Sequence, residues 1–218
     1  MKYSDVEKVL GRNQHKDLLN IENIIDLTNK KILITGANGS IGTALRKRLD
    51  ASQIPYLATD IEGSLEYMDV TDFRQVYSTV NKYQPDFIVN IAGAKHAPDG
   101  EHETWRTLAI NTIGTKNLID CAPAGCSIIL TSTCKSANPE IVYGASKLIA
   151  ERMVMNAGGS VARFFNVVES SGNVFEIWGD LPENSPIKVA PTCERHFISI
   201  GESVGLLLYA MSENTNKR

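Results

Sequence analysis

The stretch KILITGANGSIGTALRKRLDAS, residues 31–52, decides the fold. KILIT is an apolar run typical of a buried strand, and IGTALRKRLDAS carries its apolar residues on one face of a helix. Between them lies a G-x-x-G-x-x-G pattern. Such glycines let the backbone turn tightly and approach a pyrophosphate, and the free N–H groups that begin the helix favour its negative charge. We predict a strand–turn–helix that binds a dinucleotide through Gly36, Asn38, Gly39, Ser40, Ile41 and Gly42.

The same alternation of strand and helix continues along the chain. Further strands are predicted at 55–59, 86–93, 127–133 and 160–166, and helices at 71–83, 103–122 and 142–157. Strands separated by helices of this length form a parallel sheet with helices on both faces. The sequence therefore predicts an α/β fold, a Rossmann-type doubly wound parallel sheet with a small C-terminal substrate cap.

The 218 residues suit one hydrophobic core with short additions at its ends. Residues 1–30 alternate charged and apolar side chains, which predicts an N-terminal helical arm. Residues 31–166 form the predicted dinucleotide-binding domain. Residues 167–218 begin with a stretch rich in Gly, Pro and Asn and end in a predicted helix. We expect this last part to form a substrate-binding cap over the carboxyl ends of the strands, where open α/β sheets bind ligands.

Charge and hydropathy exclude several classes of protein. The formal charge of -3 at pH 7 is spread along the chain, so a nucleic-acid partner is not expected. No apolar run approaches the roughly 20 residues of a membrane-spanning helix, and the first residues lack the apolar core of a signal peptide. Four cysteines without a CxxC pair predict reduced thiols. We therefore expect a cytoplasmic protein with no membrane partner.

Two acidic residues extend the predicted cofactor site. Asp60 lies at the end of the second predicted strand, where a carboxylate can accept hydrogen bonds from both adenosine ribose hydroxyls and repel a 2′-phosphate. This favours NAD over NADP, and the alternative is an aspartate that only caps a turn. Asp69 could hold the adenine amino group or cap the helix that starts near Asp72. Further cofactor contacts are predicted at Val70, Ala92, Gly93 and Ala94.

Tyr143 and Lys147 are four residues apart on a predicted helix, so both side chains project from one face. An ammonium group near a phenol favours the phenolate and lowers the tyrosine pKa from its usual value of about 10. The pair could then serve as general base or acid for a hydroxyl being oxidised or a ketone being reduced. A Tyr-x-x-x-Lys pair alone also occurs by chance in many helices.

Other features accompany the pair: the glycine turn, NIAGA at the end of the strand predicted at 86–93, Asn111, and Ser132–Thr133 at the end of the strand predicted at 127–133. Together they resemble the extended short-chain dehydrogenase/reductases. The resemblance implies that Thr133 hydrogen-bonds the reacting hydroxyl and Tyr143 exchanges its proton. It also implies that Lys147 grips the nicotinamide ribose. The Tyr143 and Lys147 side chains thus belong to both the catalytic and the cofactor-binding predictions.

A narrower resemblance covers nearly the whole chain. TGANGSIGTAL, INTIGTKNLID, STCKSANP, YGASKLIAE and RFFNVVESSGNV occur in the same order as in UDP-N-acetylglucosamine 4,6-dehydratases of polysaccharide biosynthesis, which this chain resembles. In those enzymes the sugar is oxidised at C4, a base removes the C5 proton, an acid helps the C6 hydroxyl to leave, and hydride returns to C6. The family motif is Ser-Thr-Asp-Lys, and Lys135 matches the base.

Cys134 stands where that motif has its acid. A thiol with a pKa near 8.5 donates a proton about four pH units less readily than a carboxylic acid, and it accepts hydrogen bonds poorly. Elimination should be slowed or abolished, whereas hydride exchange at C4 needs no aspartate. Three interpretations remain: a weakened acid in a working dehydratase, redirected chemistry such as C4 epimerisation or ketone reduction, or a disabled site in a nucleotide-binding homologue.

The resemblance also supplies predictions for a UDP-sugar substrate. It implies substrate contacts from Lys95, His96, Asn166 and Arg195. The Arg195 guanidinium would pair with the diphosphate, unless the side chain only faces solvent. The segment 96–103 is rich in His, Asp and Glu, but the family places this loop over the sugar nucleotide without a metal, so no metal site is expected. The resemblance also implies a homo-oligomer, because members of the superfamily commonly dimerise through the long helices that here begin near Glu103 and Val142.

Overall fold

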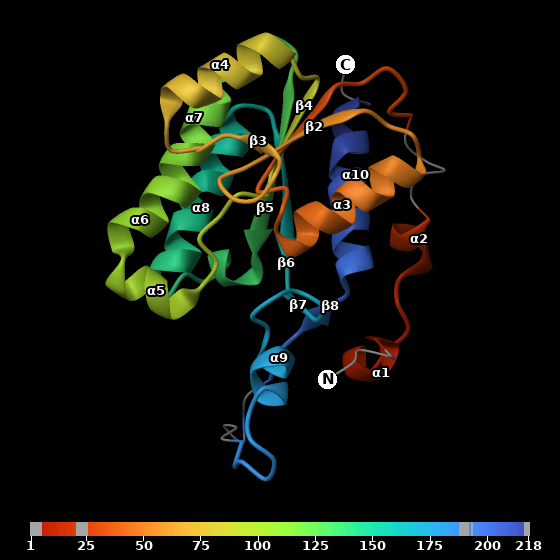
Figure 1. Cartoon of the computed structure of the whole chain (residues 1–218), viewed down its shortest axis with the longest axis vertical. Coiled ribbons are helices and arrows are strands. Elements are labelled where there is room, and N and C mark those ends of the chain that lie inside the picture. The colour runs from red at the N-terminus through yellow and green to blue at the C-terminus, as the bar shows by residue number, and fades with distance from the viewer. Residues whose placement is uncertain (1–5, 21–25, 188–191, 193, 216–218) are drawn as a thin grey trace.

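The computed structural model describes residues 6–20, 26–187, 192 and 194–215. Its centre is a six-stranded parallel sheet with the strand order β3-β2-β1-β4-β5-β6 (Figure 1). The strands are β1 (Ile32–Thr35), β2 (Tyr56–Asp60), β3 (Glu66–Tyr67), β4 (Phe87–Asn90), β5 (Ser127–Thr133) and β6 (Ser160–Phe164). This arrangement confirms the predicted α/β, Rossmann-type doubly wound sheet.

Alternate residues of each central strand face two helical layers. In β1, Ile32 and Ile34 pack into one apolar cluster and Leu33 into the other, as the two-residue period of a strand requires. The first cluster lies between the sheet and the helices α3 (Ser40–Ala51) and α10 (Ile200–Thr215), which contact each other. The second cluster lies under α4 (Phe73–Tyr83), α7 (Gly114–Cys121) and α8 (Val142–Asn156) (Figure 1).

The segment 103–122, predicted as a single helix, is divided in the structure. It consists of α6 (Thr104–Leu108), a π-helical turn η2 (Ala109–Ile113) and α7. A short helix, α5 (Ala97–His102), precedes it. π-helical turns widen a helix locally and are frequent at functional sites. Here the wide turn places the fully buried Asn111 against the loop after β4.

The boundary predicted for the C-terminal cap differs from the structure. α10 is part of the helical layer on the sheet, because Leu207 and Met211 are buried in the cluster shared with α3. The described part that projects beyond the sheet is the preceding segment (Figure 1). It contains β7 (Asn166–Val167), paired in parallel with β8 (Phe197–Ile198), and α9 (Val174–Gly179). Residues 188–191, 193 and 216–218 of the predicted cap lie outside the described residues.

The predicted N-terminal arm contributes two helices, α1 (Val6–Leu10) and α2 (Lys16–Leu19), of which α2 packs on α10. Gly205 of α10 is the contact point, because a Cβ atom there would lie 2.1 Å from the Leu18 carbonyl oxygen. Only glycine therefore allows this close approach. Residues 1–5 and 21–25 of the predicted arm lie outside the described residues.

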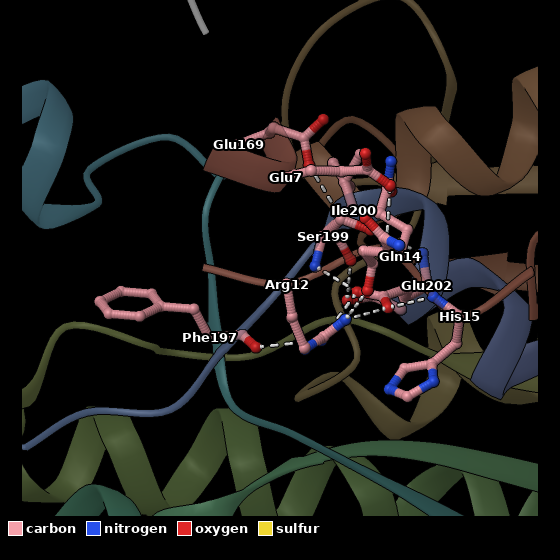
Figure 2. Close-up of polar contacts among 11 residues, drawn as sticks. Glu7, Arg12, Gln14, His15, Glu169, Phe197, Ser199, Ile200 and Glu202 are labelled. Atoms are coloured by element: carbon pink, nitrogen blue, oxygen red, sulfur yellow. Dashed lines mark hydrogen bonds and ion pairs between the residues drawn. The ribbon is translucent and has the colours of Figure 1, made fainter. Parts of the chain in front are cut away.

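A buried carboxylate joins the arm to α10 (Figure 2). The side chain of Glu202 is fully buried and accepts hydrogen bonds from Arg12 Nη1 at 2.7 Å and Arg12 Nη2 at 3.2 Å. The backbone N–H groups of His15 and Ser199 donate to it at 2.8 and 3.0 Å. Burial alone would raise the pKa of Glu202, but the Arg12 and backbone hydrogen bonds outweigh burial and lower it to about 2.

Arg12 also reaches β8 of the projecting segment, because its Nη2 donates to the Phe197 carbonyl at 3.4 Å. The arm is thus bonded to both α10 and β8. Within the described ranges, no helix combines the length and apolar character that crossing a membrane requires.

Candidate active site

The strand order reverses between β1 and β4, and the glycine turn lies at the carboxyl end of β1, beside this point. Gly36 has a φ of 64°, and a Cβ there would lie 2.6 Å from the Ala92 backbone nitrogen. At Gly42 a Cβ would lie 2.5 Å from the Gly36 oxygen. Gly39, the residue before α3, caps the helix without a side-chain hydrogen bond. The turn therefore presents a helix N-terminus with bare backbone, as a phosphate group requires.

The two acidic residues of the predicted cofactor site both bond to backbone. Asp60 accepts hydrogen bonds from the N–H groups of Asn38, Ile61 and Glu62, at 2.8, 2.8 and 3.3 Å. It thereby joins the end of β2 to the glycine turn. Asp69 accepts from the backbone and hydroxyl of Thr71, both at 2.8 Å.

Asp72, and not Asp69, caps α4, because it accepts from Arg74 N at 2.8 Å and Gln75 N at 3.3 Å. Asp69 is thus not the cap of that helix, and its role toward adenine stays a prediction. Val70 is buried against Gly114 of α7, where a Cβ would lie 2.6 Å from the valine Cγ2.

The loop after β4 is held by the π-helical turn. Asn111 Oδ1 accepts from Ala94 N at 2.9 Å, and Asn111 Nδ2 donates to Ala94 O at 3.1 Å and to Ser146 Oγ at 3.0 Å. Gly93 lies next to Lys147, because a Cβ at Gly93 would be 3.0 Å from the lysine Nζ. The predicted residues Ala92, Gly93 and Ala94 are therefore brought together with the predicted Tyr–Lys helix.

Thr133, Tyr143 and Lys147 meet at the carboxyl end of β5. The Thr133 side chain lies close enough to the Tyr143 phenol to lower the pKa of the phenol. Lys147 is 4% exposed, and its Nζ donates to the Thr131 carbonyl at 3.1 Å. Burial lowers the pKa of Lys147 to about 8, although the charge of Glu151 opposes this change. The buried amine of Lys147 therefore gains or loses its proton at a pH of about 8.

The predicted lowering of the Tyr143 pKa is wrong for this structure. Burial raises the pKa of Tyr143, the hydrogen bond with Thr133 opposes this change, and the neighbouring charge of Cys134 adds to it. The Lys147 ammonium is bonded to a backbone carbonyl, and burial of the phenol dominates. The spacing of Tyr143 and Lys147 predicted that they share one helix face. It did not predict the burial of the two side chains, which decides the direction of their pKa changes.

A cavity of about 400 Å³ opens beside these residues. Its lining contains four of the predicted site residues, Cys134, Lys135, Asn166 and Arg195. The other lining residues are Asn138, Glu140, Ile141, Phe165, Glu194 and His196.

Two of the predicted residues in the cavity wall, Asn166 and Arg195, donate hydrogen bonds to backbone carbonyls. Asn166 Nδ2 donates to the His196 carbonyl at 3.0 Å, and the exposed Arg195 donates to the Glu194 carbonyl at 2.8 Å. The rings of Phe165 and His196 lie 5.1 Å apart and give the wall an aromatic part. A cavity with lysine, arginine, amide and aromatic groups suits a ligand that is anionic in one part and planar in another.

Lys95 and His96 are not among the residues that line this cavity. Lys95 Nζ donates to the carbonyl of Ser171 at 2.7 Å and to its hydroxyl at 3.2 Å, and Ser171 N donates to Ser40 Oγ at 3.0 Å. His96 lies against Gly172, where a Cβ would be 3.1 Å from its Cε1 atom. Both residues thus contact the segment that leaves β7, and a direct substrate contact stays a prediction.

The sequence interpretation missed a buried polar cluster behind the reactive turn. Glu151 of α8 accepts hydrogen bonds from Ser132, Ser136 and Arg163. A signal was present, because Tyr143, Lys147 and Glu151 follow one another at intervals of four and so share one helix face. Across the part of the chain that the structure describes, no three His, Cys, Asp or Glu side chains come together as ligands of a metal ion.

A doubly wound sheet, a glycine turn at its first strand, and a Thr–Tyr–Lys group at the carboxyl end of β5 define the class of extended short-chain dehydrogenase/reductases. Within this class the chain belongs to the family of polysaccharide biosynthesis proteins, whose model matches residues 53–218.

Known proteins of this kind are similar to the chain over most of its length. The probable polysaccharide biosynthesis protein EpsC of Bacillus subtilis is 31% identical over 94% of this chain and 39% of its own length. A UDP-N-acetylglucosamine 4,6-dehydratase (inverting) of Campylobacter jejuni is 29% identical over 82% of this chain and 62% of its own length. The chain thus spans about two fifths of the first relative and under two thirds of the second.

Among solved structures, the Bordetella bronchiseptica enzyme WbmH in complex with NAD+ superimposes with a TM-score of 0.70 at 19% identity. The match covers 83% of this chain and 72% of that one. At this identity the likeness shows the fold alone.

Proposed function

We propose that the chain catalyses NAD(P)-dependent modification of a nucleotide sugar, most specifically 4,6-dehydration of UDP-N-acetylglucosamine or a related UDP-sugar. One observation supports the proposal: Thr133 acts on the Tyr143 phenol, Lys147 of the same helix is buried, and Cys134 and Lys135, which directly follow Thr133, line the cavity. The similarity to the Campylobacter jejuni dehydratase supports the reaction class.

The residues present fit a dinucleotide. The glycine turn leaves room where a Cβ would otherwise fill the approach to α3, and Asp60 ends β2 beside it. NAD is the proposed cofactor, because a carboxylate at this position repels a 2′-phosphate, and NADP is the alternative. A nicotinamide bound there would accept the C4 hydride and return it to the sugar. The nucleotide would be held by the turn, and its ribose by Lys147.

The side chains of the site have separate proposed tasks. Thr133 orients the C4 hydroxyl, and Tyr143 takes its proton as general base. The amine of Lys135 then removes the C5 proton, which the adjacent ketone has made acidic. The thiol of Cys134 gives a proton to the departing C6 hydroxyl, which leaves as water. When hydride returns to C6, Lys135 gives the proton back to C5, and the proton that Tyr143 took from the C4 hydroxyl restores the Cys134 thiol through solvent. Arg195 and Asn166 would bind the nucleotide diphosphate and the sugar at the cavity wall.

A second function is favoured by Cys134 itself. The thiol is a weak acid, whereas C4 oxidation and reduction need only Thr133, Tyr143 and Lys147. A C4 epimerase or ketoreductase acting on a nucleotide sugar is therefore the alternative. A nucleotide-binding homologue with an impaired site is the third reading.

Mass spectrometry separates these functions. The protein is incubated with UDP-N-acetylglucosamine and either NAD or NADP. A product lighter by one water, without net consumption of cofactor, is expected. An isobaric product indicates epimerisation, and stoichiometric cofactor turnover indicates a reductase. Unchanged substrate together with nucleotide-induced thermal stabilisation indicates the impaired homologue and rejects the enzymatic proposal.

We further propose a homo-oligomer and a reducing, cytoplasmic location. Trp105 on α6 is 73% exposed, and Ile113 on η2 and Ile149 on α8 are exposed as well. All three lie on the helices from which an oligomer is predicted. The spacing of the four cysteines, which contains no CxxC pair, supports a reducing location. The substrate cap is proposed to be the segment between Asn166 and Ile198, without α10.

A further inference from the structure

Glu151 is a buried carboxylate to which the proposed reaction gives no task. It lies on α8 one turn beyond Lys147 and is 2% exposed. Its Oε1 accepts hydrogen bonds from Ser132 Oγ at 2.5 Å and Ser136 Oγ at 2.6 Å. Arg163 of β6 donates from Nε to Oε1 at 2.8 Å and from Nη2 to Oε2 at 2.5 Å. Four donors thus converge on one carboxylate.

The two serines stand directly before and after the reactive turn. Ser132 is the penultimate residue of β5, and Ser136 ends the short 3₁₀ turn that follows it. Ser136 Oγ is also within hydrogen-bond distance of the Thr133 carbonyl, at 2.7 Å, and Lys135 N donates to Thr133 Oγ1 at 3.3 Å. Because both ends of the turn are bonded to Glu151, the orientation of the side chains between them depends on this carboxylate.

We propose that Glu151 is a positioning residue: it holds Ser132 and Ser136, and so fixes the turn that presents residues 133–135 to the substrate. The inference rests on the proposed function, because it assigns a task at the same site. A displacement of about 1 Å at reacting groups lowers a rate by about 100-fold, so fixing the turn is a substantial contribution.

The charge of Glu151 acts on the same site. Burial alone would raise its pKa, but the hydrogen bonds from Arg163, Ser132 and Ser136 lower it, so the group stays ionised. Its negative charge raises the pKa of Lys147 against the effect of burial.

Among the described residues, the charge that acts on the pKa of Lys147 is that of Glu151. The Thr131 carbonyl of β5, the Asn111 amide of η2 and the titratable Tyr143 on the same helix also lie near Lys147. Glu151 therefore opposes the lowering of the Lys147 pKa by burial.

Three substitutions separate the two effects of Glu151. Glu151→Gln removes the charge and weakens the bonds to the turn. Ser136→Ala loosens the turn and keeps the charge. Arg163→Gln removes the cation that pairs with Glu151, so that the negative charge of Glu151 acts more strongly on Lys147. For whichever turnover the unsubstituted chain shows, we expect Glu151→Gln to lower kcat by about 10- to 100-fold.

The pH profile of kcat is the readout that a merely structural role would not move. Activity that needs protonated Lys147 declines as pH rises above about 8. We expect this decline to move to lower pH in Glu151→Gln, to higher pH in Arg163→Gln, and to stay in place in Ser136→Ala while kcat falls. Lower activity of Glu151→Gln at every pH, without opposite displacements, would overturn the assigned effect of its charge on Lys147. An unchanged kcat in both Glu151→Gln and Ser136→Ala would overturn its task as a positioning residue.

A second readout needs no substrate. The pKa of Lys147 is lowered on folding from 10.5 to about 8, so its contribution to stability is present at high pH and is lost as pH falls through about 8. We expect this loss of unfolding free energy to occur at lower pH in Glu151→Gln and at higher pH in Arg163→Gln. It should be missing in Lys147→Met.

The two readouts distinguish failure of the inference from failure of the proposed function. If the unsubstituted chain shows no turnover but the stability profiles move as stated, the enzymatic function is rejected and the task of Glu151 stands. If turnover occurs, kcat of Glu151→Gln stays within about twofold, and neither profile moves, the inference is rejected.

Discussion

Replacing Glu202 by glutamine tests whether the arm is bonded to α10 by a strong, buried interaction. The carboxylate is fully buried and has four hydrogen-bond donors, two of them from Arg12 (Figure 2). Its pKa is lowered from 4.5 to about 2. At 1.36 kcal/mol per pH unit, this difference corresponds to about 3.4 kcal/mol.

Part of that free energy is lost to solvent screening, because the Arg12 side chain is 36% exposed. We therefore expect Glu202→Gln to lower the free energy of unfolding by about 2–3 kcal/mol at pH 7. A group whose pKa is lowered on folding stabilises the protein above its unfolded pKa, and this stabilisation is lost as pH falls from 4.5 through about 2. The difference between the two proteins should therefore shrink strongly by pH 3.

Urea unfolding followed by circular dichroism at pH 7 and pH 3 measures both quantities. Glu103→Gln is the matched control, because Glu103 pairs with Arg106 at 2.8 Å but the side chains are 53% and 68% exposed. We expect the control to change stability by no more than about 0.5 kcal/mol. Equal effects of the two substitutions at pH 7, or a Glu202→Gln effect that is unchanged at pH 3, would refute the reasoning.

Three further predictions concern the site. Cys134→Asp should raise the rate of water loss at least about tenfold by supplying a stronger acid, measured by product mass; a lower rate would argue against Cys134 as the acid. Tyr143→Phe should lower kcat by about 10²–10⁴-fold and keep nucleotide-induced thermal stabilisation; full turnover would exclude the tyrosine as base. Gly36→Ala should destabilise the fold by about 1–3 kcal/mol, because its φ is 64° and its Cβ would meet Ala92. Gly39→Ala, whose Cβ has only a 3.4 Å contact, should keep the fold and weaken nucleotide binding in calorimetry; equal stability losses would be inconsistent with these geometries.

The parts of the fold that depend on neighbouring residues could be predicted from the sequence. The glycine turn and the alternation of strands and helices are local patterns, and together they indicate the doubly wound parallel sheet that the structure contains. The shared face of Tyr143 and Lys147 follows from helical spacing alone. These signals needed no knowledge of the packed structure.

The features that depend on packing were not predictable in the same way. The direction of the Tyr143 pKa change depends on burial, which helical spacing does not specify. Glu151 has its partners on β5, the following turn and β6, so its cluster exists only in the assembled sheet. α10 resembled part of a cap because it follows an irregular segment, but Leu207 and Met211 are buried against the sheet.

The bond from Arg12 to the Phe197 carbonyl has a consequence for any experiment on a shortened chain. Phe197 directly follows His196 and Arg195, which line the cavity, and Ser199 bonds to the same carboxylate as Arg12. A force or a bound protein acting on residues 6–19 would therefore be transmitted to the ligand-facing loop through Arg12 and Glu202. In a chain that begins at residue 31, the loop would lack its bond to the arm. The ligand affinity and the kinetics measured on that chain would therefore differ from those of the chain with the arm.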